Sequence, residues 1–406
     1  MNERQDTEGL RNVRHDYGNL GLTGIRNVAI RVVDKLDRSL TQRYWLEAIA
    51  FFGVLTSLFL AFPSFDPDVE SSRALAVKSM IHGLGEYWDG LGPHSSIHAR
   101  VIAYRITVPL LARLLGLGLL GCYAIQYLAG VGLIYIVARL SYQATSDRVC
   151  TALSTLVICS TYAGSSAFVD LRPLFDGVAY FFLAAAMWTA WPPAITTLVV
   201  LASFTDERAL VASGFVFLWW ILRSSDQFRQ REDIPTERRM LQLVVRPSAV
   251  VAAWIIYLGV RISIRDWYNI PLETKNYDFF KLINNAPMAL WTAFEGGWIV
   301  IAWAIVVLML RRKWWLLACH LCVGSVLIFG AISIVDMTRS MAYLFPAFII
   351  AVFVVASDTE RPALRYVLLC VAAVSVMCPA YYAGGKSTIW WQYPFPLQMI
   401  GLVMGL

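Results

Sequence analysis

Long apolar blocks are the feature that most constrains this chain. The first runs from Trp45 to Phe62. Others follow as far as residue 384, most of them near the length of about 15–25 residues that crosses hydrocarbon. Only 15% of the 406 residues are charged, whereas a soluble protein carries roughly 25%. The sequence therefore predicts an all-α polytopic membrane protein and argues against a soluble enzyme with one apolar core.

We expect about eleven transmembrane helices, within a range of about 10–13, because several block boundaries are uncertain. Two of the blocks are short, and Trp191-Pro192-Pro193 separates them, so broken or tilted helices are expected there. The expected spans are 46–62, 116–138, 149–169, 177–191, 194–204, 209–222, 247–264, 288–310, 314–334, 341–357 and 366–384.

The distribution of Lys and Arg predicts the orientation. Basic residues are dense in loops 139–148, 223–246 and 311–313 and at Arg361 and Arg365. By the positive-inside rule, these loops and the N-terminus lie in the cytoplasm. The net charge of +6 is then a property of membrane loops, and no nucleic-acid partner is expected.

Two units follow from this layout. Residues 1–44 are predicted to form a cytoplasmic amphipathic segment that lies on membrane lipids. Its apolar residues recur at helical spacing, at Ile25, Val28, Val32, Leu36 and Leu40. Residues 45–406 are predicted to form a single transmembrane domain, with no soluble domain at the C-terminus.

The opposite loops combine acids with bases. Acidic side chains are expensive near lipid, so several of them at helix ends on one face indicate a shared polar cavity. Each motif taken alone also fits an ion pair that caps helix ends. The residues concerned are Asp66, Asp68 and Glu70 after the first span, Arg172 with Asp176, Asp206 with Arg208, Asp336 with Arg339, and Lys386 before Trp390.

The first external loop, residues 63–115, is predicted to contain interfacial helices. From Val69 to Leu84 the pattern favours an amphipathic helix with Leu75 and Met80 on its apolar side. A second, basic helix covers 99–111 and carries Arg105. The arginine fork suits a lipid phosphate, although Arg105 could instead only snorkel to headgroups.

Three features together resemble the GT-C glycosyltransferases, which are multi-span membrane enzymes. They are the carboxylates directly after the first span, the long loop with interfacial helices, and the Arg105-x-x-x-Pro109-Leu110-Leu111 entry into the second span. The resemblance covers most of the chain by architecture, through short motifs. It implies a sugar donor on a polyprenyl-phosphate carrier and a reaction outside the cytoplasm, most simply at a bacterial inner membrane.

The resemblance also implies a catalytic base in the first external loop. By position the base is Asp66 or Asp68, and Pro67 favours Asp68 by fixing the turn before it. Glu70 is a weaker candidate. Such a base takes the proton of the acceptor hydroxyl, and a single base implies direct displacement with inversion. A second carboxylate acting as nucleophile stays open. No cofactor is required.

The leaving phosphate needs cations, and the other site residues follow from this need. The phosphate-binding candidates are Arg105, Arg208, Arg339, Arg172 and Lys386. Asp176, Asp206 and Glu70 would orient these cations or contact sugar hydroxyls. Trp390 is either a sugar-stacking platform or part of an interfacial aromatic belt.

Several alternatives remain. Asp66-x-Asp68 also matches an Asp-x-Asp pair that binds a divalent cation with a nucleotide sugar, but nucleotide sugars are cytoplasmic. We expect no metal at Cys319-His320-Leu321-Cys322, which lies inside a span. A polymerase or ligase acting on a diphosphate-linked glycan would need a larger late loop than 265–287. A transporter or flippase would need acids at mid-membrane. The acceptor is a glycan, a lipid or a protein.

Overall fold

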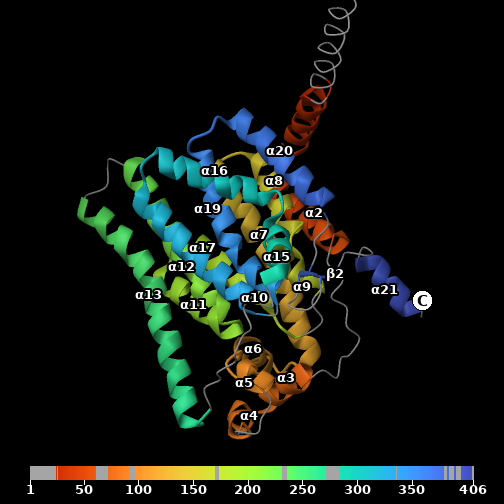
Figure 1. The fold of residues 1–406 in the computed structure, drawn as a ribbon, viewed down its shortest axis with the longest axis vertical. Coiled ribbons are helices and arrows are strands. Elements are labelled where there is room, and N and C mark those ends of the chain that lie inside the picture. Colours follow the sequence, from red (N-terminus) through yellow and green to blue (C-terminus); the bar gives the residue numbers. More distant parts are fainter. Residues whose placement is uncertain are drawn as a thin grey trace, which may run out of the picture.

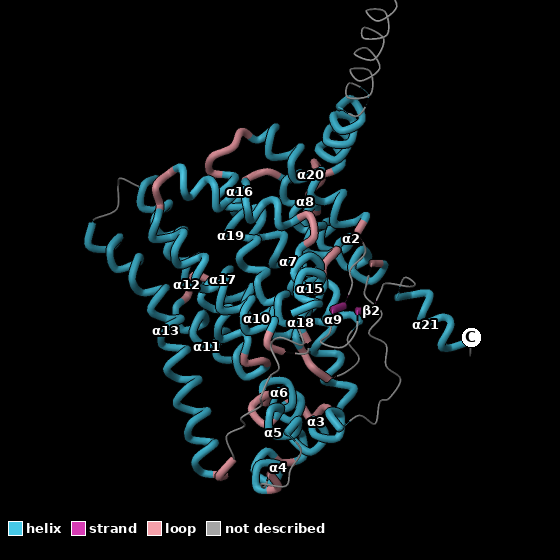
Figure 2. The backbone as a smooth tube through the Cα atoms, in the orientation of Figure 1, coloured by secondary structure: helices cyan, strands magenta, loops and turns pink. Residues whose placement is uncertain are grey.

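The structure is a computed structural model, and within its described residues it is almost entirely helical (Figures 1 and 2). It describes residue 24 and residues 26–60, 72–91, 97–169, 173–230, 236–270, 283–334, 336–378, 382–383, 388–389 and 395–404. Two strands of two residues each, β1 (Tyr382–Ala383) and β2 (Thr388–Ile389), pair antiparallel. The predicted all-α class is confirmed.

The helices follow the predicted apolar blocks. Pro192 stands at the first position of α11, where its missing N–H costs no hydrogen bond, so the two short blocks form separate helices. The long elements are α2 (Trp45–Phe59), α7 (Leu119–Thr145), α8 (Arg148–Cys159), α9 (Tyr162–Val169), α10 (Asp176–Trp188), α11 (Pro192–Thr205), α12 (Arg208–Gln230), α13 (Thr236–Trp267), α15 (Ala286–Phe294), α16 (Gly297–Leu310), α17 (Trp314–Ile332), α19 (Phe345–Ala356), α20 (Arg361–Met377) and α21 (Phe395–Met404).

Several of these helices are long and apolar enough to fit an integral membrane protein. By length and composition, four stretches of the described residues could cross a bilayer, or up to six if each bent helix pair counts as one span. The four are Leu119–Thr145, Val244–Trp267, Trp314–Ile332 and Met337–Ala356. The predicted count of about eleven is not confirmed.

Two predicted spans are bent rather than continuous. Within the block 149–169, α8 and α9 meet at 58°. Within 288–310, the segment that ends in α15 meets α16 at 87°. The spans predicted over 149–169 and 288–310 carried no sign of these bends, because apolar content does not reveal where a helix breaks.

The four helices of the loop that was predicted to be the first external one pack at one end of the bundle (Figure 1). They are α3 (Ser72–His82), α4 (Leu84–Asp89), α5 (Ile97–Ile102) and α6 (Thr107–Leu114). The face predicted for the first of them needs correction. Met80 is buried as predicted, together with Ala74 and Val77, whereas Leu75 is 57% exposed and therefore lies off the buried face.

The core lies between α7, α10, α12 and α19, where aromatic side chains also complete the backbone hydrogen bonding. Trp219 and Trp220 of α12 are fully buried. Their indole N–H groups donate to the carbonyls of Met187 and Ala186, at 2.7 and 3.0 Å. These carbonyls belong to the last turn of α10, which lacks helical partners, so the tryptophans satisfy the end of that helix.

The N-terminal segment is helical over residues 26–39. Val33 and Leu40 are buried, whereas Val28 is 60% and Val32 is 38% exposed. The helix therefore has an apolar side that the rest of the described chain does not cover. Its placement on the cytoplasmic leaflet stays a prediction.

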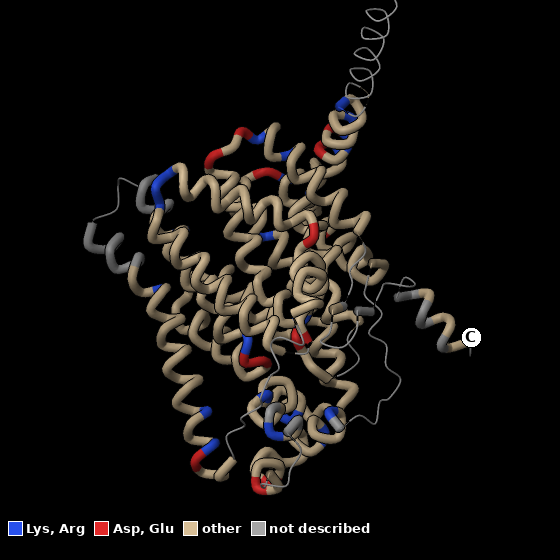
Figure 3. Tube along the Cα trace, in the orientation of Figure 1, with Lys and Arg blue, Asp and Glu red and all other residues tan. Residues whose placement is uncertain are grey.

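Charged residues gather at separate levels of the bundle (Figure 3). At the end opposite the first loop, Arg365 of α20 binds Asp147, with a shortest contact of 2.6 Å, and also Asp37. Arg311 of the α16–α17 turn pairs with Asp358 of the α19–α20 turn. The loops predicted to be cytoplasmic are thus joined at one end; which end faces the cytoplasm stays a prediction.

Asp147 supplies a test of this end cluster. It is 5% exposed, and its Oδ1 accepts the N–H of Cys150 at 2.8 Å, which caps α8. Burial raises the pKa of Asp147, but the bonds from Arg365 and Cys150 outweigh burial and leave the pKa below its usual value. The folded state therefore gains stability above about pH 4, and loses it as the pH falls through the lowered pKa.

We expect Asp147→Asn to lower the free energy of unfolding by about 1 kcal/mol at neutral pH, since Asn still caps the helix but loses the charge. The variant should also lose less stability than the wild type when the pH is lowered. Thermal unfolding of the purified protein between pH 7 and pH 3 measures both effects. Asp37→Asn, at the more exposed partner of Arg365, serves as the control and should change little.

Candidate functional site

The ends of several helices bring buried charges together beside the first loop. Asp176 is the first residue of α10, and Asp206 is the C-cap of α11. Arg208 begins α12, and Arg339 lies in the short helix α18 (Met337–Met341). With Arg105, Glu207 and Asp336 these residues form what we call the charged network.

Arg339 lies at the centre of the network and is 2% exposed. Its Nε donates to Asp176. Its Nη2 lies 3.2 Å from Asp206 Oδ2, and its Nη1 lies 3.2 Å from Asp336 Oδ2. One guanidinium thus joins acids from α10, from the α11–α12 turn and from the start of α18.

Arg208 makes a second set of bonds to the same aspartates. Its Nε and Nη2 donate to the two oxygens of Asp206 at 2.7 and 2.6 Å, and Nη2 also reaches Asp176 Oδ1 at 3.3 Å. Its Nη1 donates to Ser340 Oγ at 2.7 Å. The guanidinium lies 5.1 Å from the ring centre of Tyr343, whose hydroxyl donates to Asp176 at 3.1 Å.

Arg105 connects the first loop to the network. It lies in the turn between α5 and α6, rather than within the single helix predicted over 99–111. Its Nη1 is 3.0 Å from Asp206 Oδ2, and its Nε and Nη2 donate to the two oxygens of Glu207 at 3.2 and 2.9 Å. The side chain is only 12% exposed, so Arg105 does not simply snorkel to headgroups.

The network also constrains the backbone. Phe175, just before Asp176, has φ 59° and ψ 25°, a left-handed conformation that is uncommon for a bulky residue. Gly177, just after Asp176, lies so close to α9 that an added Cβ would be 2.7 Å from the Cα of Ala167. The chain around Asp176 therefore fits tightly in one conformation.

The electrostatics of the network are nearly balanced. Three arginines face four carboxylates, and Asp206 contacts all three arginines. Burial raises the pKa of Asp206, but Arg105 and then Arg208 outweigh it and hold that pKa far below its usual value. The donating guanidinium nitrogens all point to a carboxylate or hydroxyl of the site. Glu207, whose side chain is 36% exposed, is the most open of the four carboxylates.

The structure brings together five of the predicted site residues, namely Arg105, Arg208, Arg339, Asp176 and Asp206. Their convergence was predicted from their position at helix ends on one face. The other predicted site residues, Asp66, Asp68, Glu70, Arg172, Lys386 and Trp390, lie outside the described residues, so their roles stay predictions.

Sequence reasoning missed four members of the site and one acid beyond it. Glu207 lies between the predicted Asp206 and Arg208 but was not itself predicted, and Ser340, Tyr343 and Tyr180 carried no signal beyond their place near Arg339. Tyr180 donates to the backbone carbonyl of Arg339 at 3.1 Å. Glu295 lay unremarked inside a predicted span, although a lone acid followed by two glycines in an apolar block is a readable signal.

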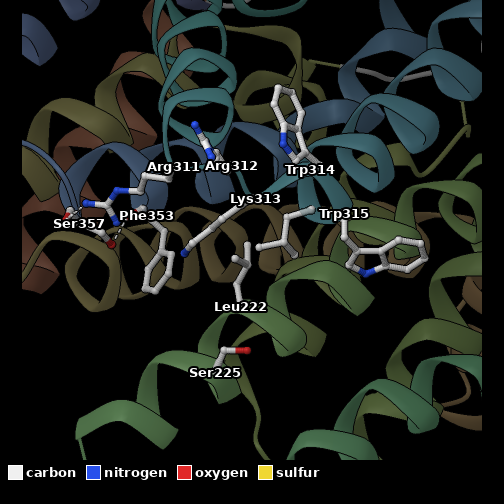
Figure 4. Close-up of a pocket in the computed structure, with 10 residues that line it drawn as sticks. Leu222, Ser225, Arg311, Arg312, Lys313, Trp314, Trp315, Phe353 and Ser357 are labelled. Atoms are coloured by element: carbon white, nitrogen blue, oxygen red, sulfur yellow. Dashed lines mark hydrogen bonds between the residues drawn. The ribbon is translucent and has the colours of Figure 1, made fainter.

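Two hollows lie away from the network. The first, of about 430 Å³, lies beside the α16–α17 turn and is lined by Arg311, Arg312, Lys313, Trp314 and Trp315 together with parts of α12 and α19 (Figure 4). Basic and aromatic side chains are a typical lining for lipid headgroups at a membrane interface. The second, of about 290 Å³, is mainly apolar and lies between the N-terminal helix, α2 and α8.

Among the residues that the structure describes, no group of three His, Cys, Asp or Glu side chains is placed to hold a metal. His320 packs edge-on against Phe215, with ring centres 5.2 Å apart, and all seven cysteines are free. The Asp66-x-Asp68 pair, where a divalent cation would bind, lies outside the described residues.

Comparisons with known proteins found no matching family model, no matching curated protein and no matching solved structure.

Proposed function

We propose that this chain is an integral-membrane glycosyltransferase of the GT-C type. It would move a sugar from a polyprenyl-phosphate carrier to an acceptor hydroxyl, at the end of the bundle where the first loop lies. The observation that carries this proposal is the burial of Arg105 between Asp206 and Glu207. This contact fixes the described end of the first loop, at Arg105, to a buried network of arginines and aspartates.

The residues divide into roles. Asp68, with Asp66 as the alternative, takes the proton of the acceptor hydroxyl as its oxygen bonds to the sugar carbon. The bond from that carbon to the phosphate oxygen breaks on the opposite side, so the product is inverted. Arg105 is the best-placed described cation for the leaving phosphate, because its partner Glu207 is partly open to solvent.

Arg208 and Arg339 have a supporting part in this proposal. Both are held by Asp176 and Asp206, and Asp206 in turn contacts Arg105. They therefore position Arg105 through a shared carboxylate. Arg172 and Lys386 remain further candidates for the phosphate, and Glu70 and Trp390 for the sugar or acceptor. A bacterial inner membrane, with this site on the periplasmic face, fits the separation of charged loops between the two ends.

Substitution of the proposed base tests this function. Asp68→Asn and Asp66→Asn are made singly and together. Each variant that removes the base should lower transfer by about 10²-fold or more, as expected for loss of general-base catalysis. Release of polyprenyl phosphate from labelled polyprenyl-phosphate sugars, by full-length protein in detergent and without any gradient, measures this. Asp89→Asn, at an exposed acid of α4 in the same loop, is the matched control. Unchanged release in both single variants and the double variant would refute the assignment.

One observation favours a second candidate, a transporter or flippase. Glu295 is an acid in the interior of the bundle at a helix break, and such breaks carry ion sites in transporters. The same assay separates the two candidates, because a transporter moves its lipid-linked substrate without cleaving it.

A further inference from the structure

Glu295 is a buried acid that the proposed transfer does not use. It is the C-cap of α15, at the 87° break before α16, and Gly296 and Gly297 follow it. The residue is 1% exposed, and neither carboxyl oxygen has a hydrogen-bond partner among the described residues. Ser375 Oγ of α20 is likewise buried without a partner in this part of the chain.

The surroundings of the break are tightly packed. A Cβ on Gly296 would lie 2.5 Å from the carbonyl oxygen of Val371 and 3.2 Å from Ser375 Oγ, so α20 closes over this point. A Cβ on Gly297 would lie 3.3 Å from Val157 and 3.4 Å from Phe348. Glu295 therefore follows a helix end enclosed by apolar side chains and one hydroxyl.

The backbone of Glu295 is strained as well. Its φ of 47° and ψ of −118° lie in a backbone region that L-residues rarely adopt and that glycine adopts without steric cost. Stability alone would favour a glycine here, since an acid adds both strain and an unpaired buried polar group. The combination points to a role for the carboxyl group itself.

Glu295 is also connected to the charged network through α15. One turn earlier on this helix, the hydroxyl of Thr292 lies 3.1 Å from that of Thr338 in a buried hydrogen bond. Thr338 precedes Arg339 directly in α18. The acid therefore lies one helical turn beyond a threonine pair that borders the network.

We propose that Glu295 is a proton-binding site, a carboxylic acid that holds its proton inside the bundle and exchanges it when the α15–α16 break opens to water. An ionised carboxylate without a partner is strongly disfavoured in such a place, whereas the neutral acid is tolerated. Two carboxyl oxygens and one hydroxyl are also fewer than the six to eight oxygens that Ca²⁺ takes.

The titratable groups nearby do not supply a counter-ion. Cys378, just after α20, interacts electrostatically with Glu295 and is itself an acid. On α18, Arg339 is engaged by Asp176, Asp206 and Asp336. Since no cation among the described residues pairs with Glu295, protonation is the simplest way to remove its charge. The inference goes beyond sugar transfer, and its tests do not measure transfer.

The first test uses the wild-type protein in lipid nanodiscs. Dicyclohexylcarbodiimide adds to protonated carboxyl groups in apolar surroundings and leaves an N-acylurea that peptide mass mapping locates. We expect label on Glu295 that declines as the pH rises, and none on Glu47, an exposed acid of α2. Absence of label on Glu295 at every pH would overturn the proposal, as would labelling that sodium suppresses at constant pH, which would indicate a cation site.

The second test uses two variants that should fold. Glu295→Gln keeps the neutral shape, and Glu295→Gly relieves the backbone. The unfolding temperature of the wild type should fall as the pH rises through the titration of Glu295, because the folded state binds the proton more tightly than the unfolded state. Both variants should lose that dependence, and Glu47→Gln should retain it. Identical pH profiles in wild type and both variants would overturn the proposal.

Discussion

Replacing Arg339 with methionine should destabilise the protein by about 3–5 kcal/mol, the cost of removing one partner from a buried ion pair. Methionine fills similar space but leaves Asp176, Asp206 and Asp336 without the cation that they share. Asp176 and Asp206 keep Arg208 as a partner, so the effect is a loss of stability rather than of folding. Chemical or thermal unfolding of the purified protein measures it.

Two further variants separate charge from geometry at this position. Arg339→Lys keeps the charge but not the planar fork that reaches three carboxylates, so it should recover only part of the loss. Arg361→Met removes an exposed arginine at the start of α20 and should change stability by no more than about 0.5 kcal/mol. Equal effects of Arg339→Met and Arg361→Met would show that the network contributes little.

The second large effect is expected at Gly177. Valine at this position should cost about 3 kcal/mol, at the upper end of the range for overpacking. The added Cβ would lie 2.4 Å from the Cβ and 2.7 Å from the Cα of Ala167, and backbone atoms of α9 cannot rotate away. Because Gly177 follows Asp176, the shift of α10 would also pull that carboxylate from Arg339.

The same substitution elsewhere supplies the control. Gly259 lies in α13, is exposed, and has nothing within 4 Å of an added Cβ. Gly259→Val should therefore be neutral, or slightly stabilising by about 0.5 kcal/mol, since valine is a better helix former than glycine. Unfolding measurements on the two variants side by side isolate the cost of the close approach between α9 and α10. A comparable stability for both variants would contradict the packing argument.

The sequence predicts the helical class and the places of several helices, because long apolar blocks between charged turns mark segments that avoid water. The blocks around α7, α13 and α17 were readable for that reason. The break near Ser160 was not, because the apolar block continues across it, and the break near Glu295 was marked only by that acid and the two glycines after it. Leu75 was misplaced because a short helix leaves several apolar residues from which to choose a face.

The sequence predicted five members of the candidate site, but it did not predict their bonds or the four residues around them. Asp206 and Arg208 stand at a helix junction, and Arg339 stands near the start of another helix, so topology alone brings them to one end. That Asp206 serves three arginines depends on side-chain geometry, which spacing does not encode. The depth of Arg105 was equally unreadable, since the same residue pattern fits a headgroup contact.

The order in which the chain is made gives the charged network a consequence for assembly. Asp176 is synthesised 163 positions before Arg339, which donates to it in the folded protein. Until that arginine enters the membrane, the α10 end relies on Arg208 alone, and Asp206 relies on Arg105 and Arg208. Long-range contacts of this kind close late. We therefore expect the first half of the bundle to stay incompletely packed during biogenesis until α18 is in place.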